Sequence, residues 1–396
     1  MSASGATNII AAACISAAGA TLDDCMDSML DGKGCPVAPT RFPCEQADIY
    51  PVFEVPDHFL SAPEPPLTRT TNLLLATVED AMTEAGITRP VLDGLTVGVC
   101  IGTSVGASLS FLDFYKAWKQ GDSPDLAPIK RYMVSNPTDC IMERYSFDGP
   151  SQTVVNACTS GTDAIGIAAS WIRHGLCDLV IAGGADELSA ISYNGFAGLM
   201  ITSPEPCRPF DAQRRGLNLG EGAGVLLLAS DHAVETLSTS VLGSVLGYGT
   251  CGDAYHLTAP HPEARGLEKA VQAALGQTDL SCHDIDFINV HGTGTPANDP
   301  VEGRVMQSLF PDTPYSATKG FTGHTLGAAG AIEAAFTLAC LNRGEIPPSN
   351  GFSQGDPAIG SSPIAVRTRL SSRYALSQSL AFGGNNSVLI FEGRTL

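Results

Sequence analysis

Cys158 lies between an apolar run and a series of small residues in VVNACTSGTDAIG. The pattern predicts a strand that turns sharply at Asn156-Ala157 into a helix, with Cys158 at the helix N-terminus. Unpaired amides and the helix dipole stabilise a thiolate there, so we expect its pKa to lie below about 8.5, the usual value for a free thiol. The same amides can receive the oxyanion of an attacked thioester. The alternative is an inert core cysteine, our interpretation of the other cysteines.

Two histidines lie in glycine-rich turns at predicted element ends. His291 follows an apolar run in DFINVHGTGTPANDP, and His324 precedes an Ala/Gly-rich segment in ATKGFTGHTLGAAGAIE. Neutral imidazoles whose N–H groups point at one position can stabilise a developing enolate, while Lys319 and Glu333 fix their tautomers. A lone histidine is more often structural, and Lys319 with Glu333 has the alternative of a structural ion pair.

A glycine-rich turn, SLAFGGNNSVLIF, precedes the last predicted strand. The backbone amide of Phe382 can complete an oxyanion hole, and the ring can gate a pocket. Gly383 is assigned to substrate binding in the same turn. Taken alone, the segment is only a good turn.

Short apolar runs recur between helices rich in small residues. They lie at residues 7–15, 95–102, 152–158, 178–185, 223–230, 286–292 and 387–393. Buried strands that alternate with helices predict an α/β fold with largely covered sheets. Two Pro/Gly-rich segments, 31–66 and 202–211, are expected to be surface excursions.

Two predicted helices, 162–175 and 326–345, resemble each other. Each carries Ala and Gly on nearly all faces and ends at a basic residue followed by Gly175 or Gly344. Such helices are buried and tightly apposed. Their similarity indicates an internal duplication with a junction at 234–243.

Composition limits the function classes. The chain has 396 residues, 44% of them hydrophobic, and a net charge of −19, which argues against binding nucleic acid or an anionic membrane. No apolar run reaches the roughly 18 residues needed to span a bilayer, and no basic residue before Lys33 marks a secretory signal. The 12 cysteines form no CxxC pair or Cys/His cluster. We therefore expect a cytoplasmic protein without a metal.

Four motifs, NACTSG, HGTGTP, TKGFTGH with LGAAGAIE, and FGGNN, resemble in order and interval those of elongating β-ketoacyl-acyl-carrier-protein synthases, the condensing enzymes of fatty-acid and polyketide assembly. The resemblance covers essentially the whole chain. It implies a thiolase-like fold of five αβαβα layers, with halves at 1–235 and 236–396. It also implies decarboxylative Claisen condensation, in which a malonyl unit on the phosphopantetheine arm of an acyl carrier protein extends an acyl chain by two carbons. No cofactor bound by the chain itself is implied.

The resemblance assigns roles to single residues. Cys158 takes the acyl chain as a thioester. His291 and His324 promote decarboxylation and stabilise the enolate, and Lys319 and Glu333 match the family's lysine and glutamate. The further matches are the oxyanion residue Phe382, the pantetheine-binding Thr293 and Thr295, the supporting Asp299 and Glu302, and Val105 in the acyl pocket.

Two departures leave the chemistry intact and concern the pocket and its gate. Arg214-Arg215-Gly216-Leu217 replaces the usual Arg-Asp-Gly-Phe, and Ala381 replaces the glycine before the gating phenylalanine. The compact length and the segment GLNLGEGAG are more similar to synthases of specialised pathways, such as aryl polyene formation.

The implied partners are an acyl carrier protein and a second synthase-like subunit, in a homodimer or a heterodimer. Because carrier proteins are acidic, an acidic synthase needs a local basic dock. The candidates are Lys116, Lys119, Lys130 and Arg131, for which an ordinary solvated face is the alternative.

Three rival functions fit less well. A thiolase needs a second catalytic cysteine near the C-terminus, and no cysteine follows Cys340. A chain-initiating synthase uses a Cys/His/Asn set, whereas His324 fits the Lys-x4-His pattern of elongating enzymes. A non-catalytic chain-length subunit usually lacks the cysteine, so Cys158 with both histidines favours catalysis.

Overall fold

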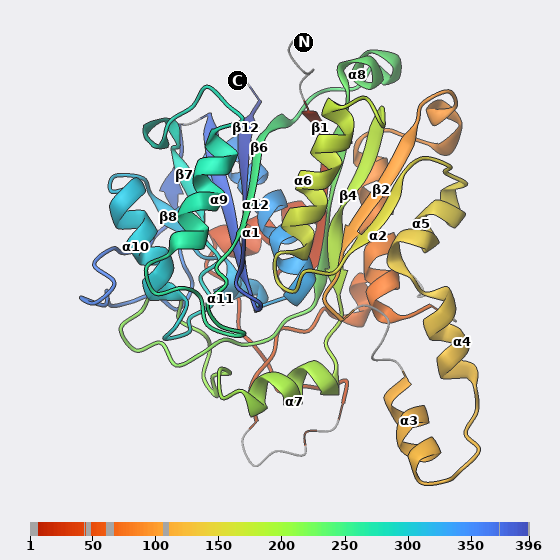
Figure 1. Ribbon diagram of the computed structural model, residues 1–396, viewed down its shortest axis with the longest axis horizontal. Coiled ribbons are helices and arrows are strands. Elements are labelled where there is room, and N and C mark those ends of the chain that lie inside the picture. The colour runs from red at the N-terminus through yellow and green to blue at the C-terminus, as the bar shows by residue number, and fades with distance from the viewer. Residues whose placement is uncertain are drawn as a thin grey trace.

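The computed structural model describes residues 7–42, 44, 49–60, 67–105, 111–371 and 373–394. Within these residues, ten strands form one mixed sheet in the order β3-β2-β4-β5-β1-β6-β12-β11-β7-β8 (Figure 1). The sheet has a natural division at the β1–β6 pairing, which joins only residues 7–9 to residues 243–245. Five strands lie on each side of this division.

The two groups of strands share one topology. The first group is β1 (Thr7–Ser16), β2 (Val97–Gly102), β3 (Ser151–Val154), β4 (Leu179–Asp186) and β5 (Gly222–Ala229). The second group is β6 (Gly243–Gly252), β7 (Phe287–Asn289), β8 (Tyr315–Ser316), β11 (Tyr374–Ala381) and β12 (Asn385–Gly393). When the strands of each group are numbered in chain order, both groups have the same arrangement. From the outer edge of the sheet to its middle, the third strand is followed by the second, fourth, fifth and first. The parallel and antiparallel pairings also correspond, so the fold is duplicated.

Helices cover both groups of strands on both faces. Helices α6 (Ser160–Arg173) and α12 (Ala329–Arg343) contact each other, and between them they contact strands of both groups. Their side chains and the inner faces of both groups form one apolar core. The outer faces pack against α2 (Arg69–Glu84) in the first group and α9 (Arg265–Leu275) in the second. The expected five-layered αβαβα fold is confirmed.

The two central helices approach each other closely at their N-terminal ends. A Cβ atom on Gly330 would lie 1.9 Å from Oγ1 of Thr162, and one on Gly161 would lie 2.8 Å from the nitrogen of Ala331. Only glycine fits at such distances. Helix α12 ends at Gly344 in the left-handed conformation, with φ 69°. The prediction of two buried, tightly apposed helices is therefore confirmed.

The remaining elements surround this frame. The helices are α1 (Leu22–Leu30), α3 (Leu112–Lys119), α4 (Ala127–Val134), α5 (Pro137–Tyr145), α7 (Ala190–Gly198), α8 (Asp231–Leu237), α10 (Asp299–Leu309) and α11 (Lys319–Thr322). Short 3-10 turns are η1 (Asp57–Phe59), η2 (Arg89–Leu92), η4 (Cys282–Asp284) and η5 (Leu326–Ala328), and β9 (Glu345–Ile346) pairs with β10 (Thr368–Arg369). Helices α3 and α4 project from the body (Figure 1). In the described part of the chain, no helix combines the length and apolarity that crossing a membrane requires.

Two sequence predictions need correction. Strands β6 and β11 were not predicted, because β6 is rich in glycine and β11 buries Ser377, Gln378 and Ser379. The two Pro/Gly-rich segments are not simple surface excursions. Phe53 is buried and pairs with Gly220, and residues 207–211 include buried side chains that support the site. Residues 61–66 lie outside the described part, and the division of the chain at residue 235 stays a prediction.

Candidate active site

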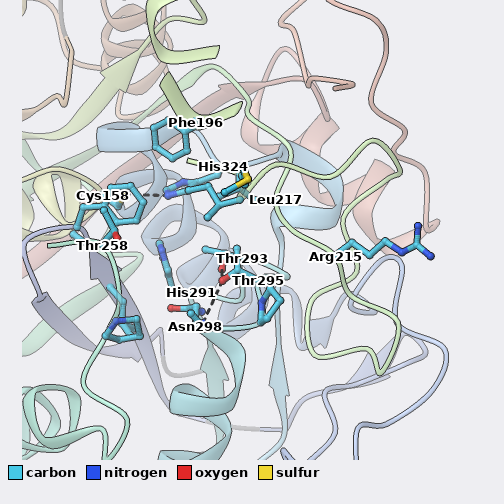
Figure 2. A pocket seen from close by; sticks show the side chains of 18 residues that line it. Cys158, Phe196, Arg215, Leu217, Thr258, His291, Thr293, Thr295, Asn298 and His324 are labelled. Atoms are coloured by element: carbon cyan, nitrogen blue, oxygen red, sulfur yellow. Dashed lines mark hydrogen bonds between the residues drawn. The ribbon is translucent and has the colours of Figure 1, made fainter. Parts of the chain in front are cut away.

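A cavity of about 310 Å³ lies where connections from both halves of the fold meet. Cys158 enters it from the β3–α6 turn, His291 from the end of β7, His324 from the segment between α11 and η5, and Phe382 from the β11–β12 turn. Figure 2 shows Cys158 beside His324, with His291 on the adjacent wall. Residues far apart in the sequence thus share one cavity because each follows a strand or precedes a buried helix.

The turn that carries Cys158 is tight. Ala157 adopts a left-handed conformation with φ 49°, which non-glycine residues rarely occupy. The amide of Ser160 bonds the carbonyl of Ala157 at 3.2 Å, and α6 begins at Ser160. Cys158 therefore sits just before the helix, as predicted, and is 5% exposed.

The sulfur of Cys158 has two polar neighbours. Sγ lies 3.0 Å from Nε2 of His324, and the backbone amide of Phe382 lies close enough to lower the pKa of the thiol. Burial nevertheless raises the pKa of Cys158 to about 12, and the opposing effects of Lys319 and the Phe382 amide are smaller. The expected lowering of this pKa is wrong, because desolvation of the anion outweighs the stabilisation at the helix end. The resting group is a neutral thiol, which must lose its proton during attack.

His324 is suited to take that proton. Burial, followed by the nearby Lys319 charge, holds its pKa well below the usual value, so the imidazole is neutral. Its ring lies 5.1 Å from the ring of His291, nearly perpendicular. Among the described residues no hydrogen-bond partner reaches Nδ1 of His324. The protein therefore leaves the tautomer of His324 to be set by Cys158 and the substrate.

The tautomer of His291 is set by Lys319. The Lys319 ammonium donates to Nδ1 of His291 at 3.1 Å, to the carbonyl of His291 at 2.6 Å, and to a carboxylate oxygen of Glu333. Since an ammonium group only donates, Nδ1 accepts and the ring proton sits on Nε2. Burial, then Lys319, then His324 hold the pKa of His291 well below its usual value. His291 thus offers a neutral Nε2–H donor to the cavity.

The ion pair of Lys319 and Glu333 is fully buried. Burial raises the pKa of Glu333 to about 7, while the Lys319 charge and hydrogen bond act in the opposite direction. The sequence left open whether this pair is structural or orients the histidines. In the structure the same ammonium makes the ion pair and the bond to His291, so both descriptions hold.

A carboxylate network supports the backbone of His291. Glu302 accepts the amide N–H of His291 at 2.6 Å and that of Gly292 at 2.7 Å. Side-chain amides of Asn298 and Gln378 donate to the same carboxylate at 2.6 and 2.7 Å. Burial, reinforced by Asp299, raises the pKa of Glu302 to about 7. Sequence reasoning missed both amides, although Asn298 directly precedes Asp299.

Asp299 supports the neighbouring segments in the same way. Its carboxylate accepts the amide N–H of Phe210 at 2.7 Å and that of Gly294 at 3.1 Å. Burial raises its pKa to about 6. Asp299 therefore ties the buried end of the 202–211 segment to the loop after His291.

Two threonines line the wall beside His291. Thr293 and Thr295 place their hydroxyl oxygens 2.9 Å apart, and Thr295 Oγ1 also accepts the amide N–H of Asn298. The pair has two hydroxyl protons and uses one between its members. Both side chains line the cavity (Figure 2), and their role in binding a ligand stays a prediction.

Phe196 is a further lining residue that the sequence did not indicate. It lies on α7, stacks on Phe382 with ring centroids 5.6 Å apart, and meets the edge of His324 at 6.5 Å. Its segment, YNGFAG, carries no local functional signal. Only the tertiary fold reveals that two aromatic rings cover the His324 side of the cavity.

Several predicted residues do not line the cavity. Val105 donates its amide to Asp186 at 3.2 Å and packs beside the pocket wall. Gly383 has φ 87° and gives its N–H to the carbonyl of Leu257 at 2.8 Å. The dock candidates lie on the projecting helices, Lys116 and Lys119 on α3 and Lys130 and Arg131 on α4. Their proposed roles stay predictions.

The structure shows where the residues lie that replace the family's usual Arg-Asp-Gly-Phe segment. Arg214 pairs with Asp356 at 2.6 Å, whereas Arg215 is among the residues that line the cavity, and its exposed guanidinium extends away from Cys158 and lies 3.3 Å from Glu205 (Figure 2). Leu217 lines the cavity. Within the described ranges, no cluster of His, Cys, Asp and Glu has the arrangement of a metal site.

Comparisons with known proteins agree with this geometry. Two family models match, the β-ketoacyl synthase N-terminal domain at residues 7–233 and the β-ketoacyl synthase C-terminal domain at residues 242–353. A mitochondrial 3-oxoacyl-[acyl-carrier-protein] synthase of Arabidopsis thaliana is 33% identical over 74% of this chain and 68% of its own. The 3-oxoacyl-[acyl-carrier-protein] synthase 2 of Staphylococcus aureus is 31% identical over 86% of this chain and 88% of its own.

Solved structures show the same fold. A chain in the ishigamide ketosynthase/chain length factor structure superposes with a TM-score of 0.92 at 28% identity, covering 99% of this chain and 100% of its own. A chain in the complex of a ketosynthase with its chain length factor from Xenorhabdus doucetiae has a TM-score of 0.84 at 30% identity, covering 98% of each chain.

Proposed function

Because the chain belongs to the β-ketoacyl synthase family of condensing enzymes, we propose that Cys158 carries the growing acyl chain as a thioester while His291 and His324 act on a malonyl thioester. The observation that carries this assignment is the contact of Sγ with Nε2 of His324 at 3.0 Å, beside a second imidazole held as an Nε2–H donor. A nucleophile and two neutral imidazoles around one cavity are what thioester condensation needs.

The first step transfers the acyl chain to the enzyme. As the neutral Cys158 thiol attacks the thioester carbonyl, its proton passes to Nε2 of His324. The oxyanion lies near the backbone N–H groups of Cys158 and Phe382. When the tetrahedral intermediate collapses, the carbon–sulfur bond to the phosphopantetheine arm breaks and the departing thiolate takes the proton from His324. No net proton is consumed.

The second step forms the new carbon–carbon bond. The malonyl thioester carbonyl accepts hydrogen bonds from Nε2–H of His291 and of His324, for which the neutral His324 ring has moved its proton from Nδ1 to Nε2 after the acyl transfer. The arm lies along Thr293 and Thr295. Loss of CO2 breaks the bond to the carboxylate and leaves an enolate, which the two imidazoles stabilise. The enolate carbon attacks the acyl carbonyl on Cys158 and expels its sulfur, which takes up one proton from solvent.

Cys158→Ala tests the assignment. Intact-protein mass spectrometry after incubation with acyl-carrier protein should show the acyl adduct on the wild type and none on the variant. Release of CO2 from malonyl-carrier protein should continue in the variant, because the two histidines are unchanged. Cys100→Ala, another buried cysteine, is the matched control and should load normally. Normal condensation by Cys158→Ala would show that the assignment is wrong.

The partners are an acyl carrier protein and a second synthase-like subunit. Two features support pairing with a subunit. Strand β3 lies at the outer edge of the sheet, and Val155 beside it is 67% exposed. Helices α3 and α4 present exposed apolar side chains, among them Trp118 and Met133. Light scattering of the purified chain, with and without a co-expressed synthase-like subunit, distinguishes homodimer from heterodimer.

The pathway proposed is a specialised one of the polyketide or polyene type. The two structures at 28% and 30% identity, both ketosynthase/chain length factor assemblies, support this choice. A cytoplasmic location suits the buried free cysteines, which the reducing cytoplasm preserves. A panel of acyl-carrier thioesters, read by the mass of the Cys158 adduct, would identify the chain length and unsaturation accepted.

A further inference from the structure

Two turns meet at Cys158, and a pair of side-chain amides joins them. Asn156 lies in the nucleophile turn and Asn385 directly follows the glycine-rich turn of Phe382. The Nδ2 group of Asn385 donates to Oδ1 of Asn156 at 2.7 Å. The Nδ2 group of Asn156 in turn donates to Oδ2 of Asp163 at 2.6 Å. Between the described residues 155–159 and 381–385, this amide bond is the hydrogen bond that joins the two turns, and beside it the Phe382 amide lowers the pKa of Cys158.

Asp163 fixes one end of this chain of bonds. It is 4% exposed and lies in the first turn of α6. Besides Asn156, it accepts the hydroxyl groups of Thr159 and Tyr248, each at 2.9 Å, and that of Ser387. Tyr248 lies on β6 and Ser387 on β12, both in the second half of the fold. Asn156 is thus attached to a buried carboxylate that is itself held by both halves.

The turns on either side of this bridge are conformationally demanding. Ala157 is left-handed, and Gly383 and Gly384 have φ angles of 87° and 77°. Neither turn forms regular strand pairing with the other. A shift of either one would move the Phe382 amide away from Cys158, because these groups come from opposite halves of the chain.

We propose that Asn156 and Asn385 are a positioning pair that holds the Phe382 amide over the Cys158 sulfur, so that the oxyanion hole is assembled across the two halves of the fold. The inference rests on the proposed function, in which this amide binds the oxyanion of acyl transfer. Neither asparagine contacts the cavity. Their effect on the reaction therefore passes through the relative position of the two turns.

Asn385→Asp is the sharpest variant, because it keeps the shape and replaces the Nδ2 donor with an oxygen that faces Oδ1 of Asn156. We expect acyl loading of Cys158 from acyl-carrier protein to slow by about tenfold to a hundredfold, less than the roughly hundredfold or more that follows removal of an oxyanion-hole donor. Alkylation of Cys158 by iodoacetamide needs no oxyanion hole and depends on the Phe382 amide only through the thiol pKa, so its rate should fall clearly less than the rate of acyl loading. Asn385→Gln, which retains an amide donor, should recover part of the loading rate.

Two further variants complete the test. In a double-mutant cycle, Asn156→Ala with Asn385→Ala should lose no more loading activity than Asn156→Ala alone, since that single variant already removes the bond between the two asparagines together with the bond to Asp163. Asn342→Asp is the matched control, because it makes the same change in a partly buried side-chain amide that donates to the carbonyl of Leu242. This variant should load the acyl chain onto Cys158 at the normal rate.

The outcomes separate three cases. Equal slowing of acyl loading and alkylation would mean a merely structural role, and unchanged loading by Asn385→Asp would also overturn the positioning pair. If the wild type itself fails to load Cys158, the proposed function fails first. Should Asn385→Asp not fold, Asn385→Gln and Asn156→Ala carry the same comparison of loading with alkylation.

Discussion

The two halves of the molecule use the same connection for opposite purposes. In each half the third strand leads to a buried central helix, β3 to α6 and β8 to α12. The first connection, residues 155–159, is short and carries Cys158. The second, residues 317–328, is longer and carries Lys319 and His324. The duplicated frame places both connections at one cavity, and their length and composition decide which delivers the nucleophile and which the imidazole.

The halves also differ in their electrostatics. The buried groups with shifted pKa values around His291 all come from the second half, namely His324, Glu333, Glu302 and Asp299. The first half contributes a thiol whose pKa is raised to about 12 by burial. The thiol therefore has its nearest proton acceptor, His324, in the other half.

The largest effect that separates the halves is expected for His291→Ala. This variant removes an enolate-stabilising donor and leaves Cys158 with His324, so decarboxylation of malonyl-carrier protein should fall by about a thousandfold or more. Acyl loading of Cys158 should fall by less than about tenfold. CO2 release and intact mass measure the two steps separately. Equal loss in both would mean that the halves do not divide the chemistry.

Lys319→Met should have the next largest effect. Removing one partner of a buried ion pair destabilises by about 3–5 kcal/mol, and decarboxylation should fall about a hundredfold because Nδ1 of His291 loses its donor. The double variant Lys319→Met/Glu333→Leu is the control. It should regain most of the stability in urea unfolding without regaining decarboxylation. Recovery of both would reduce Lys319 to a structural role.

The pH dependence of alkylation probes Cys158, the reactive group that the first half contributes. Because the pKa of Cys158 is raised to about 12, the thiolate fraction should rise about tenfold per pH unit from pH 7 to 9. Iodoacetamide alkylation, followed by mass spectrometry, should rise about a hundredfold over this interval. A plateau above pH 7 would instead indicate a thiolate already formed at the helix end.

Motif residues could be predicted because each lies at the end of a strand or just before a buried helix, where the local sequence shows an apolar run or a glycine-rich turn. Cys158, His291 and His324 were identified in this way. Residues that act only through tertiary contacts left no such signal. Phe196, Gln378 and the Asn156–Asn385 pair are brought to the site by α7, β11 and the meeting of two turns.

The error in the Cys158 pKa has a physical cause of the same kind. The sequence showed the helix end that stabilises a thiolate, but not the 5% exposure that opposes it. Strand β11 was missed because its buried face carries Ser and Gln side chains, which hydrophobic patterning treats as exposed.

Gly330→Ala tests the contact that brings the two connections together. A Cβ atom there would lie 1.9 Å from Oγ1 of Thr162, so α6 and α12 must separate, at a cost of about 2–3 kcal/mol in the free energy of unfolding. Gly195→Ala is the matched control, because Gly195 is an exposed residue of helix α7 and no atom lies within 4 Å of the added carbon. It should stabilise by up to about 1 kcal/mol. Urea denaturation measures both, and equal stability of Gly330→Ala and the wild type would contradict the close packing.

The smallest effect concerns the charges on the projecting helices of the first half. Lys130→Glu/Arg131→Glu reverses two cations on α4, outside the cavity, and should weaken binding of an acidic carrier protein by about tenfold at low salt. Turnover of a small acyl thioester should not change, because no residue of the site is altered. Arg265→Glu/Lys269→Glu on α9, in the second half, makes the same change in net charge and is the control. If the α9 variant weakens carrier binding as much as the α4 variant does, the effect comes from net charge and the docking surface lies elsewhere. The same conclusion follows if the α4 variant slows turnover of the carrier-bound and the small thioester equally, because a local docking surface affects only the carrier-bound substrate.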